Sequence, residues 1–360
     1  MTERTDNFRW DIGGGLEALA TLAKVRFDLV FRDLDAIARA YTEGTKLARE
    51  MFGPEIPFGG PRWAAISYGH VNCLGARLVF PEDSEVAHVP VYASLAEGVA
   101  ALKTDIDFTK AGLFPFYLDL WEKLKRAFPS HRIAFSGFGV EGPVTTAWLL
   151  RGHGFFMDIY DDPPLAREYL RLVTRSIVRY RQCLARINGE PEFSPEGAYV
   201  ADDGAAMIPP PLWPEFVLPF LDEYYTRLTS GRRCIHTEDL RVDHLHYLDE
   251  LRIAEYDPSV SPRLTPTLIL RHCRVPFTWR LNEGDLAGLT ADQTTAWVVD
   301  AAVQGAPAVH TGVWRNNCTP QSAENVKAFR RAAAAVQRHL EAGGSREQLA
   351  EQRSVATAGR

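Results

Sequence analysis

The sequence lacks long apolar runs, clustered cysteines and an excess of positive charge. No uncharged apolar stretch is long enough to cross a bilayer, which excludes a membrane-spanning helix. Five cysteines are scattered without a CxxC pair, so we expect reduced thiols and no disulfide framework. The net charge of −6 with no basic stripe argues against a nucleic-acid partner. No signal-peptide core is evident, and we therefore expect a cytoplasmic protein that binds no membrane.

The common nucleotide-binding motifs are also missing. No Gly-x-Gly-x-x-Gly run and no P-loop opens any predicted helix, which removes the usual nucleotide-binding open sheets. No internal repeat or low-complexity segment is present. The apolar fraction of 46% and the charged fraction of 24% are ordinary for a globular chain. A length of 360 residues suits one large α/β barrel.

Strand and helix patterns alternate along most of the chain. An N-terminal helical region (16–52) precedes short strands at 64–68, 75–80 and 86–91 and a helix at 113–128. From residue 133 onward each strand is followed by a helix, which is typical of a parallel sheet. The strands predicted there are 133–136, 197–201, 233–236, 253–256, 276–282 and 307–311. We therefore predict a (β/α)8 TIM barrel with extra N-terminal helices.

The two ends of the chain have a different composition from its middle. Residues 1–15 are polar and end in glycines, which predicts a flexible N-terminal arm. Residues 343–360 are polar and begin with two glycines, which predicts a flexible C-terminal tail. The chain between them, 16–342, is expected to form the single barrel domain.

One stretch concentrates ionisable residues where a strand passes into a helix. A short strand ends at His236, Glu238 follows two residues later, and a helical pattern begins near Asp243. Residues two apart in extended backbone point the same way, so the imidazole and the carboxylate can converge on one ion or substrate. Both suit Zn²⁺ or a similar divalent metal. A structural ion pair is the alternative, because one His-x-Glu is a weak signal.

Other polar and aromatic residues lie at the predicted ends of the remaining strands. In a parallel barrel these ends meet on one rim, where barrel enzymes carry their active sites. We expect Asp202 and Asp203 to act as acid, base or orienting groups. The remaining candidates comprise the rim carboxylate Glu141 and the predicted substrate-binding residues Tyr199, Trp279, Arg280, Asn282 and Trp314.

Each of these candidates also has a structural explanation. Asp202 and Asp203 precede Gly204 and can cap a turn; because they are adjacent, one is expected to face the rim centre. Arg280 can pair with a structural carboxylate or clamp a substrate carboxylate. His310 can be a metal ligand or a buried core histidine. Cys318 is the one thiol predicted near the rim.

Several motifs resemble the uroporphyrinogen decarboxylase superfamily, and most closely its branch of cobamide-dependent methyltransferases. The likeness covers about residues 30–340 and agrees with one barrel. The motifs occur here in the family's order: Glu141–Ala147, Asp161–Pro163, Ala201–Gly204, Pro214–Pro219 and Thr319–Asn325, with Gly75–Asp83 and Ser94–Leu95 in the N-terminal half.

The resemblance implies a site at the strand ends and, in the methyltransferase branch, a zinc that activates a thiol. The family's ligands are a His-x-Cys pair and a later cysteine. Here His236 matches the histidine, Glu238 replaces the cysteine, and the later cysteine aligns near Val313. The predicted metal ligands are therefore His236 and Glu238, completed by His310, Cys318 or Asp203. This altered set leaves open a folate acceptor, demethylation of a methoxy or quaternary-amine substrate, or no metal.

The leading hypothesis is a methyltransferase that moves a methyl group between a small molecule and a corrinoid on a partner protein. A decarboxylase acting on a carboxylated ring is the second hypothesis, but such a substrate needs several rim cations and the sequence offers chiefly Arg280 and Arg315. A non-catalytic barrel that binds a corrinoid or another small molecule is the third. A homodimer is expected by family analogy alone.

Overall fold

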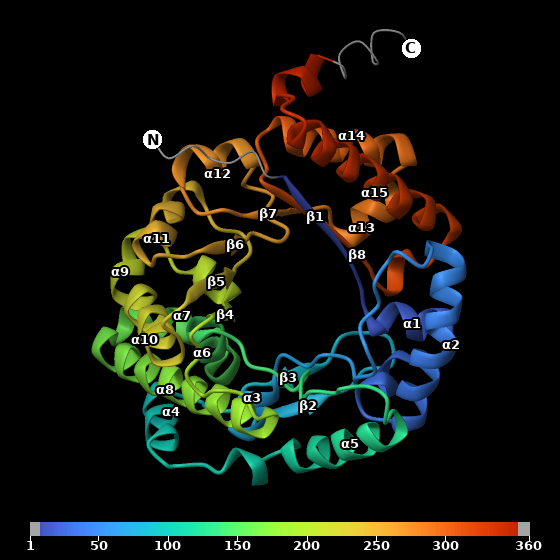
Figure 1. Ribbon diagram of the computed structural model, residues 1–360. Coiled ribbons are helices and arrows are strands. Elements are labelled where there is room, and N and C mark those ends of the chain that lie inside the picture. Colours follow the sequence, from blue (N-terminus) through green and yellow to red (C-terminus); the bar gives the residue numbers. More distant parts are fainter. Residues whose placement is uncertain (1–7, 352–360) are drawn as a thin grey trace.

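The computed structural model describes residues 8–351, and it is an α/β fold built on six parallel strands. Two three-stranded sheets, β4-β5-β6 and β7-β8-β1, are joined by a bridge between Tyr256 and Phe277. Figure 1 shows these strands curving around a centre with helices outside them. We call them the strand ring: β1 (Arg9–Gly14), β4 (Gly197–Ala201), β5 (Arg232–His236), β6 (Glu255–Asp257), β7 (Thr278–Arg280) and β8 (Ala308–Val313).

Helices cover the outside of the strand ring and include most of the predicted ones. The N-terminal helical region is broken between α1 and α2, where Lys24 has a positive φ of 53°. The helices are α1 (Leu16–Leu22), α2 (Leu34–Phe52), α3 (Gly69–Cys73), α4 (Leu95–Leu102), α5 (Phe114–Ala127), α6 (Pro143–Arg151), α7 (Phe155–Asp161), α8 (Pro163–Asn188), α9 (Trp213–Phe216), α10 (Leu218–Leu228), α11 (Leu245–Glu250), α12 (Pro266–His272), α13 (Glu283–Gly288), α14 (Ala291–Val303) and α15 (Pro320–Glu341).

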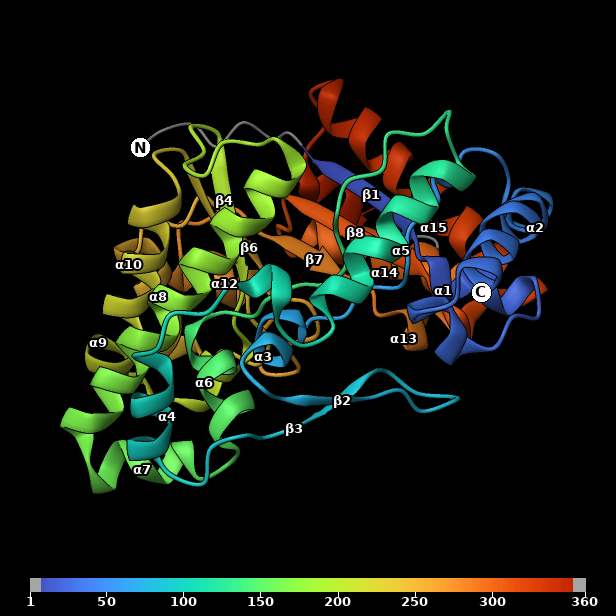
Figure 2. The ribbon, with the colours of Figure 1, turned by 90° about the horizontal axis from the view of Figure 1, so that it is seen from below.

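Two of the predicted barrel strands are not strands in the structure. Segments 64–68 and 133–136 form no regular strand, and the one isolated bridge nearby joins Ile66 to Phe138, two residues beyond the second segment. Gly137, which precedes Phe138, has a φ of +85°, and this conformation interrupts an extended strand. The parallel α/β prediction is confirmed, but a ring of eight regular parallel strands is not present among residues 8–351. The other two short segments pair as the antiparallel hairpin β2 (Arg77–Val79) and β3 (Ala87–Val89), which stands off one end of the strand ring in Figure 2.

The prediction of a flexible N-terminal arm is wrong for residues 9–14. They form β1, which pairs in register with β8, and the flanking Phe8 and the central Ile12 are buried. The glycines at the end of this segment predicted a loop, whereas the strand forms through pairing with residues about 300 positions away in sequence. The C-terminal prediction is also wrong in part, because residues 346–351 are helical and Leu349 is buried. Residues 1–7 and 352–360 lie outside the described part.

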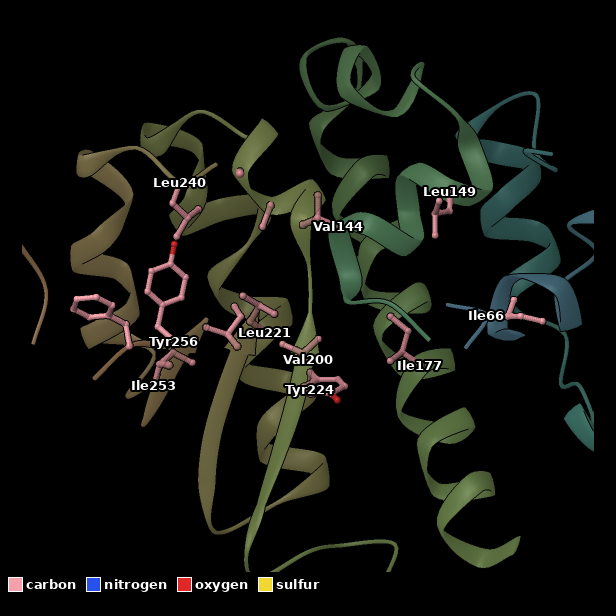
Figure 3. Close-up of a cluster of buried hydrophobic side chains, with 14 of the residues drawn as sticks. Ile66, Val144, Leu149, Ile177, Val200, Leu221, Tyr224, Leu240, Ile253 and Tyr256 are labelled. Atoms are coloured by element: carbon pink, nitrogen blue, oxygen red, sulfur yellow. The ribbon is translucent and has the colours of Figure 1, made fainter. Parts of the chain in front are cut away.

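Side chains alternate across the strand ring, and this alternation places polar groups inside it. Val200, Ile235 and Tyr256 face the helices and are buried. Figure 3 shows Val200 and Tyr256 in this outer apolar layer with residues of the helices around them. Their neighbours Tyr199 and Cys234 therefore face the ring interior. The apolar core therefore lies between the strands and the helices, and the inside of the strand ring is lined by side chains that can contact a ligand.

Asp202 ties the strand ring to α6. Its carboxylate is fully buried and accepts hydrogen bonds from the backbone of Val144 at 3.2 Å and Thr145 at 2.7 Å, and from the Thr145 hydroxyl at 2.8 Å. Negative charge is favourable at a helix N-terminus. The structure thus makes Asp202 a cap for α6, and a catalytic role for it stays a prediction.

We expect Asp202→Ala to lower the free energy of unfolding by about 2 kcal/mol or more, because buried donors lose their acceptor. Urea unfolding followed by circular dichroism measures the change. Asp35→Ala, an exposed residue in the first turn of α2, is the matched control and should cost less than about 0.5 kcal/mol. Equal losses in the two variants would contradict the capping role.

Candidate active site

The centre of the candidate site is a histidine held by a carboxylate. His236 ends β5, Asp257 ends β6, and the parallel register places the two residues side by side. His236 Nδ1 lies 2.9 Å from Asp257 Oδ2. This contact orients the ring and leaves Nε2 facing Asp203 Oδ1 at 3.6 Å and Glu238 Oε1 at 3.9 Å. The predicted convergence of His236 and Glu238 is present, with Asp203 and Asp257 added to it.

The protonation of this pair follows from its surroundings. Burial lowers the pKa of His236, but the hydrogen bond and charge of Asp257 and the charge of Asp203 outweigh burial and raise it above the usual value. Burial raises the pKa of Asp257, but the contact with His236 and the charge of Arg280 bring it below the usual value. Asp257 is therefore a carboxylate that accepts a hydrogen bond from His236 Nδ1–H. His236 Nε2 is free to give or take a proton on the other side.

Glu141 is a second group that can hold a proton near neutral pH. It lies between the segment that ends at Val140 and the start of α6. Burial raises its pKa to about 7, a hydrogen bond from Ser67 opposes that rise, and the charges of Asp203 and Asp202 add to it. The sequence placed Glu141 on the rim but assigned it no role. Only the packing of the neighbouring carboxylates indicates one.

Asp203 faces the rim, as one of the two adjacent aspartates was expected to do. It is half-buried, and its Oδ1 accepts a hydrogen bond from the backbone N–H of Glu238 at 2.9 Å. Burial is the main cause of its raised pKa, which the Glu238 N–H opposes. Asp203 and Glu238 therefore stand together on the Nε2 side of His236 as an acidic wall.

A cavity of about 400 Å³ opens inside the strand ring next to this cluster. Arg280 crosses its wall, with Nη2 3.4 Å from Asp257 Oδ2 and Nη1 3.2 Å from Ser259 Oγ. Arg280 Nε is buried and has no hydrogen-bond partner among the described residues. The cavity can thus take a small molecule beside Asp257 and Arg280. Its lining comprises Tyr199, Cys234, Ile235, Glu255, Asp257, Thr278, Arg280 and His310.

The predicted substrate-binding residues separate into two groups. Tyr199 and Arg280 line the cavity, and Trp314 lies at the C-terminal end of β8 with 39% of its surface exposed. Trp279 instead packs against the apolar core, because it alternates with Arg280 and faces outward. Asn282 Oδ1 accepts hydrogen bonds from the backbone N–H groups of Gly284 and Asp285 and caps α13. Trp279 and Asn282 thus have structural contacts, and a substrate contact for either stays a prediction.

Of the four predicted metal ligands, His236 and Glu238 lie together, but His310 and Cys318 have other contacts. His310 Nδ1 lies 3.6 Å from Asp11 Oδ2, and burial lowers the pKa of its imidazole. The Cys318 thiol lies 3.1 Å from the Trp314 carbonyl oxygen, and burial raises its pKa to about 11. No group of three or more His, Cys, Asp or Glu in residues 8–351 has a metal-binding arrangement. The donors present therefore do not fit the thiolate zinc site that the family resemblance implied.

No helix within residues 8–351 has the length and apolarity needed to cross a membrane. A comparison with curated proteins finds no match. Among solved structures, the fold is similar to a methyltransferase from Methanosarcina mazei, with a TM-score of 0.63 and 16% sequence identity over 90% of this chain and 92% of that one. The sequence profile of uroporphyrinogen decarboxylase (URO-D) matches residues 29–263, which is more than half of the chain. The chain belongs to the uroporphyrinogen decarboxylase (URO-D) family.

Proposed function

We propose that the chain is a methyltransferase that moves a methyl group between a small molecule and a corrinoid carried by a partner protein. The observation that carries this proposal is the His236–Asp257 pair, whose His236 Nε2 faces Asp203 and Glu238 and whose Asp257 lines a half-open cavity. Family membership and the fold shared with a methyltransferase from Methanosarcina mazei are consistent with it. We also propose that the strand ring, with its six strands, corresponds to part of the eight-stranded barrel of the family.

The groups around the cavity suit removal of a methyl group from a small molecule. When the bond between the methyl group and its heteroatom breaks, the electron pair stays on the heteroatom. An ether oxygen then takes a proton from His236 Nε2, while Asp257 balances the charge on the ring. An ammonium nitrogen or a sulfonium sulfur becomes neutral without one. The corrinoid would supply the cobalt centre that accepts the methyl group. Glu141, with its pKa raised to about 7 by burial, can restore a proton to the cluster.

A thiol acceptor fits the site less well than a methylated donor. The family's thiolate position is occupied by Glu238, and the Cys318 thiol is turned to backbone carbonyls. Cys234 lines the cavity, but burial raises its pKa and favours the neutral thiol. We therefore propose that the chain works on the side of the transfer that demethylates a small molecule.

The mouth of the strand ring offers apolar groups that can receive a partner protein. Met207 follows β4, Val260 follows β6 and Trp314 follows β8, so all three lie on the loops at the strand ends. Each is an exposed large hydrophobic residue. Exposed apolar groups around a polar opening are typical of a protein contact surface. A corrinoid presented by a partner at this mouth would lie over the cavity.

A decarboxylase for a multiply carboxylated ring lacks the cations it needs. Arg280 already contacts Asp257, and Arg315 donates to the Asp83 carbonyl and lies over the Phe27 ring with a centroid distance of 4.5 Å. The binding-only alternative differs from the proposed function in having no turnover. A homodimer and a cytoplasmic location stay predictions of the resemblance.

We expect His236→Ala to slow methyl transfer from a methoxyarene by about 100-fold or more, because the proton donor is lost. The assay follows the absorption change as free cob(I)alamin, under reducing conditions, takes methyl groups from methoxyarenes and methylammonium compounds. His246→Ala, an exposed histidine in α11, is the control and should keep full activity. Full activity in His236→Ala, or an inactive wild-type protein, would contradict the proposal.

The pH dependence tests how Asp257 acts. Demethylation of a methoxy substrate needs protonated His236, so its rate should be highest below the raised pKa of His236 and fall as pH rises through it. Asp257→Asn removes the largest cause that raises this pKa, and the falling limb should move to lower pH. Asp239→Asn, an exposed carboxylate nearby, should leave the limb in place. If Asp257→Asn lowers the rate at every pH and leaves the falling limb in place, Asp257 does not raise the pKa of His236.

A further inference from the structure

A second acidic group lies at the ends of β1 and β8, apart from the His236 cluster. Glu17 is in the first turn of α1 and is only 7% exposed. Its Oε2 has no hydrogen-bond partner, and no ion pair joins Glu17 to another residue within 8–351. A buried carboxylate without a cation is costly. Glu17 therefore lacks the partner that its burial calls for.

Glycines hold Glu17 against the exposed indole of Trp314. A Cβ at Gly15 would lie 2.4 Å from Glu17 Oε2 and 2.9 Å from Cε3 and Cζ3 of Trp314, so the carboxylate and the six-membered ring meet over this glycine. A Cβ at Gly312 would lie 2.6 Å from Trp314 Nε1 and 3.0 Å from Glu283 Oε1. The indole thus lies across the ends of β1 and β8 with a carboxylate at each side. Any larger residue than glycine would displace it.

The position of Trp314 is built into the fold. Its backbone N–H donates to Asn317 Oδ1 at 2.7 Å, and Asn317 Nδ2 donates to the Gly312 carbonyl at 2.8 Å. Asn317 is fully buried. The backbone of the loop is therefore anchored while more than a third of the Trp314 surface stays open to solvent. An exposed indole on an anchored loop is a surface that can receive a ligand.

The charges near Glu17 indicate what the ligand must carry. Burial raises the pKa of Glu17, a hydrogen bond from its own backbone N–H and the charge of Arg62 lower it, and the charge of Glu85 raises it again. Arg62 acts at a distance, because it forms no ion pair with Glu17 within residues 8–351. A positive group at Glu17 would relieve the cost of burial and favour the charged carboxylate.

We propose that Glu17 and Trp314 bind an organic cation, a methylated ammonium or sulfonium group, and that the methyl donor of this protein carries such a group. This inference rests on the proposed function. The face of an indole attracts a large, weakly hydrated cation, and a neighbouring carboxylate adds a full opposite charge. A metal ion is disfavoured, because the indole N–H cannot be a ligand and no metal-binding group of three side chains is present in the described residues.

A cationic donor also agrees with the direction of transfer. When a methyl group leaves an ammonium nitrogen or a sulfonium sulfur, the bonding pair stays on that atom and the positive charge is lost. The cobalt of the corrinoid in the proposed function is the acceptor. The neutral amine or thioether that is left is held less strongly by Glu17 and Trp314 than the donor was. Differential binding of this kind favours product release.

The direct test is calorimetric titration with tetramethylammonium chloride, without corrinoid or turnover. We expect saturable binding to the wild-type protein and at least about tenfold weaker binding to Glu17→Gln and Trp314→Leu. Trp314→Phe keeps an aromatic face and should lose less than Trp314→Leu. Glu50→Gln, an exposed carboxylate in α2, should bind as the wild type does, and potassium chloride at equal ionic strength should not compete.

Two outcomes would overturn the inference: no saturable binding to the wild-type protein, or unchanged binding to both Glu17→Gln and Trp314→Leu. If Glu17→Gln does not fold, Trp314→Leu decides, because its side chain is on the surface. Methyl transfer from a neutral methoxyarene with no tetramethylammonium binding would refute the cation site and leave the proposed function standing. Tetramethylammonium binding without any methyl transfer would refute the proposed function and leave the cation site standing.

Discussion

The hydrogen bond between His236 and Asp257 is the contact on which the candidate site depends. It exists because β5 and β6 are parallel and in a register that brings their last residues side by side. The carboxylate holds one ring nitrogen, and the other nitrogen is turned to Asp203 and Glu238. A shift of one residue in that register would turn His236 away, because neighbouring residues of a strand face opposite sides.

Charge is distributed unevenly around the mouth of the strand ring. Arg280 and His236 are close to Asp257, while Glu141, Asp203 and Glu17 are carboxyl groups whose pKa values are raised, in each case mainly by burial. Burying several carboxyl groups together favours their protonated forms or a cationic ligand. The same imbalance supports a group that donates protons near His236 and a cation-binding group at Glu17. The proton donor suits a methoxy donor, and the cation-binding group suits a cationic one.

Some site residues could be predicted from sequence because they follow strands directly. His236, Glu238 and Asp203 end or follow strands, and the alternation of strand and helix indicates that such ends meet on one rim. Trp279 and Asn282 have structural contacts that the sequence did not indicate, because a strand end has two faces and an asparagine after a strand is also a good helix cap. Asp257 precedes Pro258, which is the sequence context of a turn residue, and its pairing with His236 depends on inter-strand register. Glu17 gave no signal, because a glutamate in the first turn of a helix is common.

The sequence by itself determined the parallel α/β class, most of the helices and the stretch around His236, because hydrophobic periodicity and turn residues act over a few neighbouring positions. Only the tertiary structure decided that residues 9–14 are a strand, since that strand exists through pairing with β8 at the other end of the chain. It also decided that Asp202 caps α6, that Asp257 orients His236, and that Glu17 meets Trp314 over Gly15. These contacts join residues far apart in sequence, and their geometry is set by packing and register that no local pattern encodes.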